Sequence, residues 1–164
     1  MVREPASFDE VAAAPGGGAI QAAIDRCRVG GSILLQPGTY TLSAFITIAK
    51  EVHLFGRGLA RLRTVQCDGI RCGAATATVD GLIVERPTGR KKADVKGVGV
   101  AIVGGSRLRL QNSEVTGPFD YGLTITEGAD PVITASRCVR ARSLCRYMSL
   151  PLIYIIDVIY RSSV

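Results

Sequence analysis

Apolar and polar residues alternate in short segments along most of the chain. In Ile46–Ile48, Ile70–Cys72 and Leu108–Leu110 the outer two residues are apolar or small, and the middle one is threonine or arginine. A period of two residues is typical of β-strands that bury one face. The sequence therefore predicts short, half-buried strands.

These segments repeat along the chain. Gly99–Ile102 recurs as Gly122–Ile125, an offset of 23 residues, and offsets of 30 and 24 residues carry the pattern back to Ile70 and Ile46. Four rows of small or apolar residues align across four predicted coils: Ile46, Ile70, Val100 and Leu123; Ile48, Cys72, Ile102 and Ile125; Leu54, Val79, Leu110 and Ile133; Leu59, Val84, Val115 and Cys138. Strands this short cannot bury their inner faces alone, so the coils are expected to stack in parallel.

The rows predict an all-β fold, a single-stranded right-handed parallel β-helix (solenoid) of about four coils with a short N-terminal capping α-helix. A corner is predicted two residues after the third row, where the chain has Gly56, Gly81, Asn112 and Ala135. Glycine and asparagine adopt a left-handed backbone at little cost, as a sharp corner requires.

The capping helix is predicted over residues 19–28. Ile20, Ala23, Ile24 and Cys27 fall on one helical face, and the Gly30–Gly31 pair ends the segment. An amphipathic helix at this point would cover the core and the strand edges that an open solenoid end exposes.

The repeat divides the chain into three segments. Residues 1–18 form an N-terminal segment, residues 19–138 the β-helix domain, and residues 139–164 an irregular apolar C-terminal segment, because the ladder is predicted to stop after Cys138. The apolar run 150–160 has two interpretations: an irregular terminal strand that covers the open end, or a sequence that is not native coding sequence, so that the chain is truncated or misread. The sequence favours the second, in which case the run should promote association.

The stretch Ala19–Gly58, with AIQAAIDRC, GGSILLQPGTYTL and VHLFGRG, resembles the opening of pectin-lyase-like right-handed β-helix proteins. LRLQNSEVTG and YGLTITEGADPVITASRC resemble the intracellular eukaryotic branch of such repeats, found in F-box-type and other scaffold proteins. The resemblance covers residues 19–138 and implies the fold. It supplies no catalytic residue, because the paired aspartates, the Gly-His-Gly and the calcium-binding aspartates of the enzymes in this superfamily have no counterpart here.

Composition and charge limit the classes of partner and the location that are expected. The net charge of +6 is spread along the chain, so specific nucleic-acid binding is not expected. Glu4, Asp9 and Glu10 stand where a signal peptide would be basic and then apolar, and no run is long enough to span a membrane. Five cysteines in no zinc-binding spacing indicate reduced thiols and a cytoplasmic protein without metal or cofactor.

Residues in one row of adjacent coils are lateral neighbours, so two carboxylates in one row would lie close together. The predicted rows are Phe55, Asp80, Gln111 and Thr134; Ala60, Glu85, Thr116 and Val139; Gly58, Ile83, Glu114 and Arg137. No row holds the two carboxylates that glycoside hydrolysis commonly needs. No catalytic residue is assigned, and Glu114 and Arg137 are predicted to form a lateral ion pair.

Two groups of residues are candidates for binding. His53 shares an outward row with Thr78 and Arg109, so that His53 and Arg109 could contact one ligand. The basic cluster Arg90, Lys91, Lys92 and Lys96, on a predicted inserted loop, could contact an acidic partner or glycan, although a solvated loop is the simpler interpretation.

The sequence therefore favours a non-catalytic scaffold that holds a protein or glycan partner, expected to be a fragment of a longer protein. The alternative is a polysaccharide-active enzyme, similar to pectate lyases, polygalacturonases or epimerases, whose catalytic coils are missing. The pattern does not determine the oligomeric state.

Overall fold

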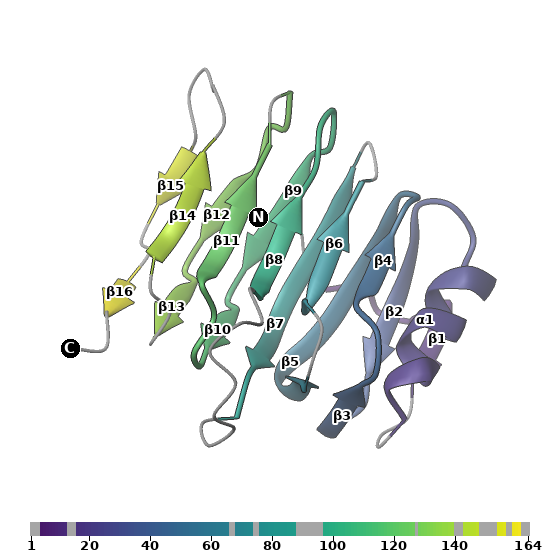
Figure 1. Ribbon diagram of the computed structural model, residues 1–164. Helices are drawn as coiled ribbons and strands as arrows, with labels where there is room; N and C mark the ends of the chain where they lie inside the picture. Colours follow the sequence, from purple (N-terminus) through teal and green to yellow (C-terminus); the bar gives the residue numbers. More distant parts are fainter. Residues whose placement is uncertain are drawn as a thin grey trace.

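The computed structural model is a parallel β-solenoid of about five turns with one short helix (Figure 1). It describes residues 4–12, 16–65, 68–73, 76–87, 97–126, 128–139, 143–147, 154–156 and 159–161. The predicted all-β solenoid with an N-terminal helix is confirmed.

The described strands stack as successive coils on one another. The elements are β1 (Glu10–Ala12), α1 (Gly17–Arg26), β2 (Gly31–Leu35), β3 (Gly38–Leu42), β4 (Ile46–Ile48), β5 (Val52–Thr64), β6 (Ile70–Cys72), β7 (Ala77–Glu85), β8 (Val98–Ile102), β9 (Leu108–Gln111), β10 (Glu114–Thr116), β11 (Tyr121–Ile125), β12 (Val132–Thr134), β13 (Arg137–Val139), β14 (Ser143–Tyr147), β15 (Tyr154–Ile156) and β16 (Ile159–Arg161). Every described strand pair is parallel, as a chain that winds in one direction requires.

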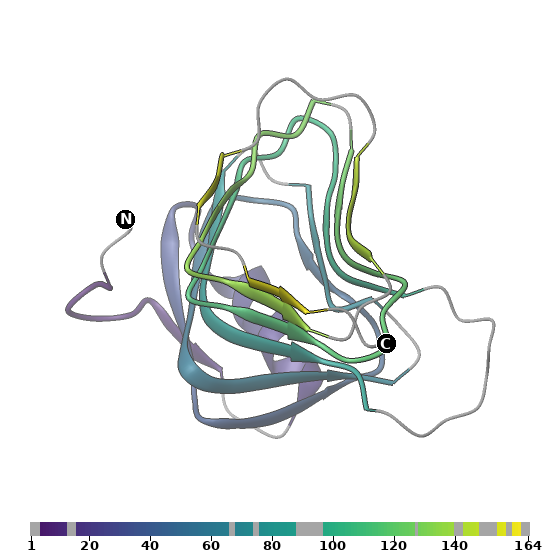
Figure 2. The same cartoon turned by 90° about the vertical axis from the view of Figure 1, so that its left-hand side faces the viewer.

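The stack has three sides when it is viewed along its axis (Figure 2). The His53 face consists of β2, the first halves of β5 and β7, then β9, β12 and β15. The Glu85 face consists of β3, the second halves of β5 and β7, then β10, β13 and β16. The Arg71 face consists of β4, β6, β8, β11 and β14.

Strand register confirms the first three predicted rows. Ile46, Ile70, Val100 and Leu123 are successive partners, as are Ile48, Cys72, Ile102 and Ile125, and Leu54, Val79, Leu110 and Ile133. All of these side chains are buried, with at most 6% of their surface exposed. Their apolar surface is removed from water only because each coil covers the next.

The fourth row is wrong at its first member. Leu62, not Leu59, pairs with Val84, and Leu59 is 57% exposed. Between two consecutive paired positions β5 has four residues, Gly56–Leu59, where β7 has only Gly81. This insertion of three residues shifts the rest of β5, so Arg63 replaces Ala60 in the Glu85 row and Arg61 replaces Gly58 in the Glu114 row.

The predicted corner is confirmed in three coils. Gly81, Asn112 and Ala135 have φ values of 65°, 50° and 46°, in the left-handed region. In the first coil the left-handed residues are Arg57 and Gly58, inside the insertion, instead of Gly56. The insertion therefore turns the chain by a different route.

The N-terminal helix covers the first coil as predicted, although it runs from Gly17 to Arg26 instead of over residues 19–28. Its apolar face, Ile20, Ala23 and Ile24 with the adjoining Cys27, is buried with 0–2% exposure. Lys50 Nζ donates hydrogen bonds to the carbonyls of Asp25 and Cys27, at 2.9 and 2.6 Å, and so satisfies the end of the helix.

The prediction that the ladder stops after Cys138 is wrong. β14 pairs with β11, β15 with β12 and β16 with β13, all in parallel, so the backbone winds through one more coil. Its apolar alternation is weak because RCVRARSLCR does not repeat the earlier pattern. Backbone hydrogen bonds form regardless of side-chain type, so the pairing continues where the side-chain pattern does not.

Candidate functional site

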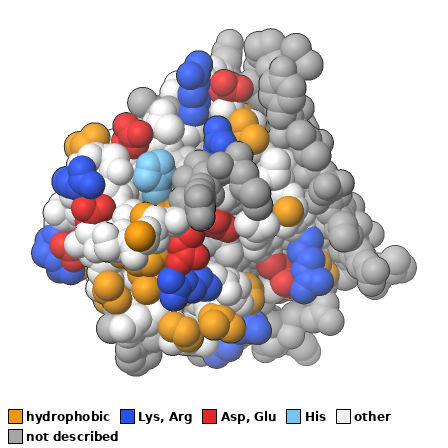
Figure 3. Space-filling model, turned by 180° about the vertical axis from the view of Figure 1, so that it is seen from behind, with side chains coloured by type: hydrophobic (Ala, Val, Ile, Leu, Met, Phe, Trp, Pro, Cys, Tyr) orange, Lys and Arg blue, Asp and Glu red, His pale blue; other side chains and the backbone are white. Residues whose placement is uncertain are grey.

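The predicted His53 row exists. Ser32, His53, Thr78, Arg109 and Val132 are successive partners on the outer side of the His53 face. His53 and Arg109 are half-buried, and Thr78 between them is 1% exposed. The pale blue side chain in Figure 3 is the chain's single histidine, with acidic and basic side chains around it.

His53 and Arg109 are two strands apart, which places their backbones about 10 Å from one another at the usual spacing of 4.8 Å per strand. The two side chains could therefore meet only through a bridging ligand. His53 Nδ1 is shielded from solvent and has no hydrogen-bond partner in the described structure. No described carboxylate bonds to this nitrogen, so the ring lacks the orienting partner that a general base needs.

The neighbouring row holds a closed polar cluster. Gln111 Nε2 and Asn112 Nδ2 each donate a 2.8 Å hydrogen bond to a different oxygen of Asp80. Gln111 is 2% exposed. Both carboxylate oxygens are thus used to join adjacent coils at the corner, which is a structural role.

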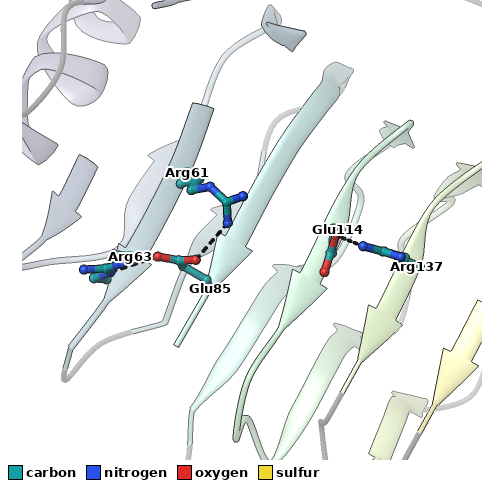
Figure 4. A network of polar contacts seen from close by, with 5 residues as sticks. All are labelled: Arg61, Arg63, Glu85, Glu114 and Arg137. Carbon is teal, nitrogen blue, oxygen red and sulfur yellow. Dashed lines mark hydrogen bonds and ion pairs between the residues drawn. The ribbon is translucent and has the colours of Figure 1, made fainter. Parts of the chain in front are cut away.

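The Glu85 face carries a second polar array, which we call the arginine–glutamate ladder: Arg61, Arg63, Glu85, Glu114 and Arg137. Glu85 accepts from Arg61 Nη1 at 3.3 Å and from Arg63 Nε at 2.8 Å, and Glu114 accepts from Arg137 Nη2 at 2.6 Å (Figure 4). The predicted pair of Glu114 and Arg137 is confirmed.

The arginines form the outer layer of this ladder. Their side chains are 47–57% exposed, whereas those of Glu85 and Glu114 are 15% and 21% exposed. Exposed ion pairs stabilise a fold by only about 0–1 kcal/mol. The ladder therefore contributes little to stability. Each guanidinium group has five N–H donors, so donors that are not used in the ion pairs remain available to a ligand from solvent.

The pairs of Glu85 with Arg61 and Arg63 were missed because the predicted register ignored the insertion. The alternation Ala60–Thr64, with arginine at every second position, is the signal that could have placed them. The basic cluster of Arg90, Lys91, Lys92 and Lys96 lies outside the described residues.

The N-terminal segment provides a further group of contacts. Phe8 packs edge-to-face on Phe55, with ring centroids 5.6 Å apart, and the Arg57 guanidinium lies 5.6 Å from the Phe8 centroid. Glu4 forms an ion pair with Arg57. An aromatic pair contributes about 0.5–1.5 kcal/mol beyond its area and an exposed cation–π contact about 0.5–1 kcal/mol, so this segment is held weakly.

Residues just after this segment are held more firmly. Asp9 accepts hydrogen bonds from Arg28 Nε at 2.7 Å and from the backbone N–H of Ser32 at 2.8 Å. These bonds lower the pKa of Asp9 from 3.8 to about 2, with the Arg28 bond the largest cause. Asp9 thus fixes the start of β1 on β2.

The cysteines behave as core residues where the structure describes them. Cys27, Cys72 and Cys138 are buried and unbridged, and burial raises the pKa of the Cys27 thiol. Three or more potential metal ligands do not cluster anywhere in the described residues. The one described helix, ten residues long, is too short to span a membrane.

No protein-family model matches this sequence, and comparisons with the curated proteins and with the solved structures give no significant match. What this chain binds is therefore inferred from its own residues.

Proposed function

We propose that this protein is a non-catalytic binding scaffold whose Glu85 face holds an extended acidic glycan. The observation that carries the proposal is the arginine–glutamate ladder, in which three arginines, two on β5 and one on β13, form the outer layer of one continuous sheet surface. Arginine suits this role, because its planar guanidinium binds carboxylates in a two-pronged geometry.

The stacking of coils matches an extended ligand. β5 and β13 are three strand spacings apart, about 14 Å at 4.8 Å per strand, so a polymer that runs along the stack can contact the arginines at both ends of the ladder. The overall charge of +6 favours a polymer of negative charge. Multiple weak contacts along one polymer then add into useful affinity.

A binding role fits this face better than catalysis. Glu85 and Glu114 are each engaged by arginine, whereas glycoside hydrolysis needs one carboxyl group that donates a proton and a second that acts as base or nucleophile. The proposal includes kinship with the pectin-lyase-like superfamily and a cytoplasmic location, which the fold and the reduced cysteines support.

The test is binding of the full chain to polygalacturonate, with fully methyl-esterified pectin as the uncharged control polymer. Arg61→Glu/Arg63→Glu should weaken binding about tenfold or more, the equivalent of 1.4 kcal/mol. The matched control, Arg71→Glu/Arg107→Glu, makes the same change of charge outside the Glu85 face and should alter binding less than about threefold.

Equal losses in the two double variants would show that net charge alone attracts the polymer, and would overturn the assignment to the Glu85 face. The release of reducing ends or of unsaturated products by this chain would overturn the non-catalytic role and favour a polysaccharide-active enzyme. Binding of poly-glutamate but not of polygalacturonate would identify an acidic protein, instead of a glycan, as the partner.

A further inference from the structure

A segment before the first strand lies on the outside of the solenoid. Asp9 continues the parallel pairing of β1 with β2, because its N–H donates to the Ser32 carbonyl at 2.9 Å. Residues 4–8 leave that edge and reach β5, where Phe8 meets Phe55 and Glu4 meets Arg57. Figure 2 shows this purple segment outside the stacked coils.

The position that it contacts departs from the repeat in two ways. Phe55 is the only aromatic residue in its described outward row, which consists of Val11, Leu34, Phe55, Asp80, Gln111, Thr134 and Ile156. Phe55 is nevertheless 2% exposed. An outward-facing aromatic side chain is shielded here at the place where the N-terminal segment docks.

The second departure is the three-residue insertion within Gly56–Leu59. It places Arg57 in a left-handed conformation, φ 53°, which is unfavourable for a residue with a side chain. The Arg57 guanidinium then contacts both the Glu4 carboxylate and the face of the Phe8 ring. Phe55 and the inserted Arg57 thus lie together, where they contact one carboxylate and one aromatic ring.

We propose that Phe55 and Arg57 form a docking site, the Phe55–Arg57 clasp, for an extended peptide that carries a carboxylate and, four residues later, an aromatic side chain. The chain's own segment Glu4–Phe8 has this pattern and occupies the clasp. A partner peptide of the same chemistry displaces it. The segment itself shows which ligand the clasp fits.

The contacts allow this exchange. Glu4 and Arg57 side chains are 40% and 53% exposed, so their ion pair is open to water and to competing ligands. Asp9 anchors β1 through Arg28 and Ser32, independently of the clasp. Residues 4–8 can therefore leave while β1 stays paired.

The test uses a fluorescent peptide of residues 4–9, EPASFD, added to full-length chains. Glu4→Ala/Phe8→Ala vacates the clasp, and this variant should bind the peptide at least tenfold more tightly than the wild-type chain, in which the internal segment competes. A peptide in which the same two residues are alanine should bind at least tenfold more weakly to the vacated variant.

Arg57→Gly, added to the vacated variant, removes the guanidinium while glycine suits the left-handed backbone, so the fold is preserved and peptide binding should be lost. Arg61→Glu/Arg63→Glu, added instead, should leave peptide binding unchanged, which separates this site from the proposed glycan surface. Circular dichroism spectra check that each variant is folded.

Equal peptide affinity of the wild-type and vacated chains would overturn the proposal, as would unchanged binding after Arg57→Gly. Concentration-dependent dimers of the wild-type chain that disappear in the Glu4→Ala/Phe8→Ala variant would identify a second copy of this chain as the occupant, and would overturn the partner-peptide assignment.

Discussion

The two ends of the solenoid differ in how far their strand edges are paired or covered. At the N-terminal end each described strand of the first coil has a partner: β1 pairs with β2, Gly16 forms a bridge to Thr41 of β3, and Gln21 of α1 bonds to Thr47 of β4. At the C-terminal end, β14, β15 and β16 each pair with one earlier strand, and no described strand follows them. Among the described residues, the first coil is thus covered by a helix and a bridging residue, and the last coil has neighbours on one side.

The closure at the N-terminal end depends on one side chain in particular. Gln21 of α1 accepts a hydrogen bond from the Thr47 N–H at 2.9 Å and donates one to the Thr47 carbonyl at 3.2 Å. Its amide thus takes the place of a neighbouring strand. Unpaired edge groups promote pairing with other chains, so an end without such a device is the end where association should begin.

Removal of residues 140–164 should have the largest effect on behaviour in solution. The deletion removes the apolar run 150–160 together with β14, β15 and β16. The coil of β11, β12 and β13 loses one neighbour, but the earlier coils keep theirs, since each coil of a solenoid contacts only the next. The soluble fraction should rise severalfold, with cooperative unfolding retained, as measured by sedimentation and thermal melts. Loss of folding would instead show that this segment is a required cap.

The packing of α1 on the first coil depends on Ile24, which is 2% exposed. Ile24→Ala should lower the free energy of unfolding by about 2–5 kcal/mol, because it leaves a cavity between α1 and the first coil. Urea denaturation measures the change. Val29→Ala, at a position 67% exposed, is the matched control and should change it by less than about 0.5 kcal/mol.

The strand-like role of Gln21 predicts a smaller loss. Gln21→Leu leaves the Thr47 N–H and carbonyl without their partner and should cost about 1–3 kcal/mol in urea denaturation. Gln21→Glu keeps the acceptor and loses the donor, so its effect should fall between wild type and Gln21→Leu. An equal stability of all three chains would refute the capping role of this amide.

The smallest expected effect is a dependence on pH at Asp9. Because the folded-state pKa of Asp9 is lowered from 3.8 to about 2, its contribution to stability is complete above about pH 4 and is lost as the pH falls through 2. Asp9→Asn should therefore be less stable than wild type at pH 5, and the two chains should converge near pH 2. A constant difference in unfolding free energy across this range would contradict the assignment.

Much of the fold could be predicted because the solenoid repeats its constraints. Each inward row needs an apolar side chain in every coil, so three rows were visible in the sequence and each aligns as predicted. The fourth row failed at Leu59, since an insertion of three residues breaks the count while the apolar residues on both sides make either register plausible.

The candidate site was less accessible to sequence analysis. The His53 row was predicted correctly. The order of residues did not, however, reveal that Thr78 is buried between His53 and Arg109. The arginine–glutamate ladder depended on the shifted register of β5. The Phe55–Arg57 clasp depended on contacts between residues 47 and 53 positions apart, Phe8 with Phe55 and Glu4 with Arg57. The alternation Ala60–Thr64 is a local signal for the ladder, whereas the clasp has none.

The sequence by itself determined the strand period, the coil repeat, the left-handed corners at Gly81 and Asn112, and the buried face of the N-terminal helix, because each follows from local geometry or from a side chain's preference for water or core. Only the tertiary structure decided the register across the insertion, the pairing of the last coil, and the contacts of Glu4 and Phe8. Those features depend on which segments meet in space, where backbone hydrogen bonding and packing between distant residues outweigh the local pattern.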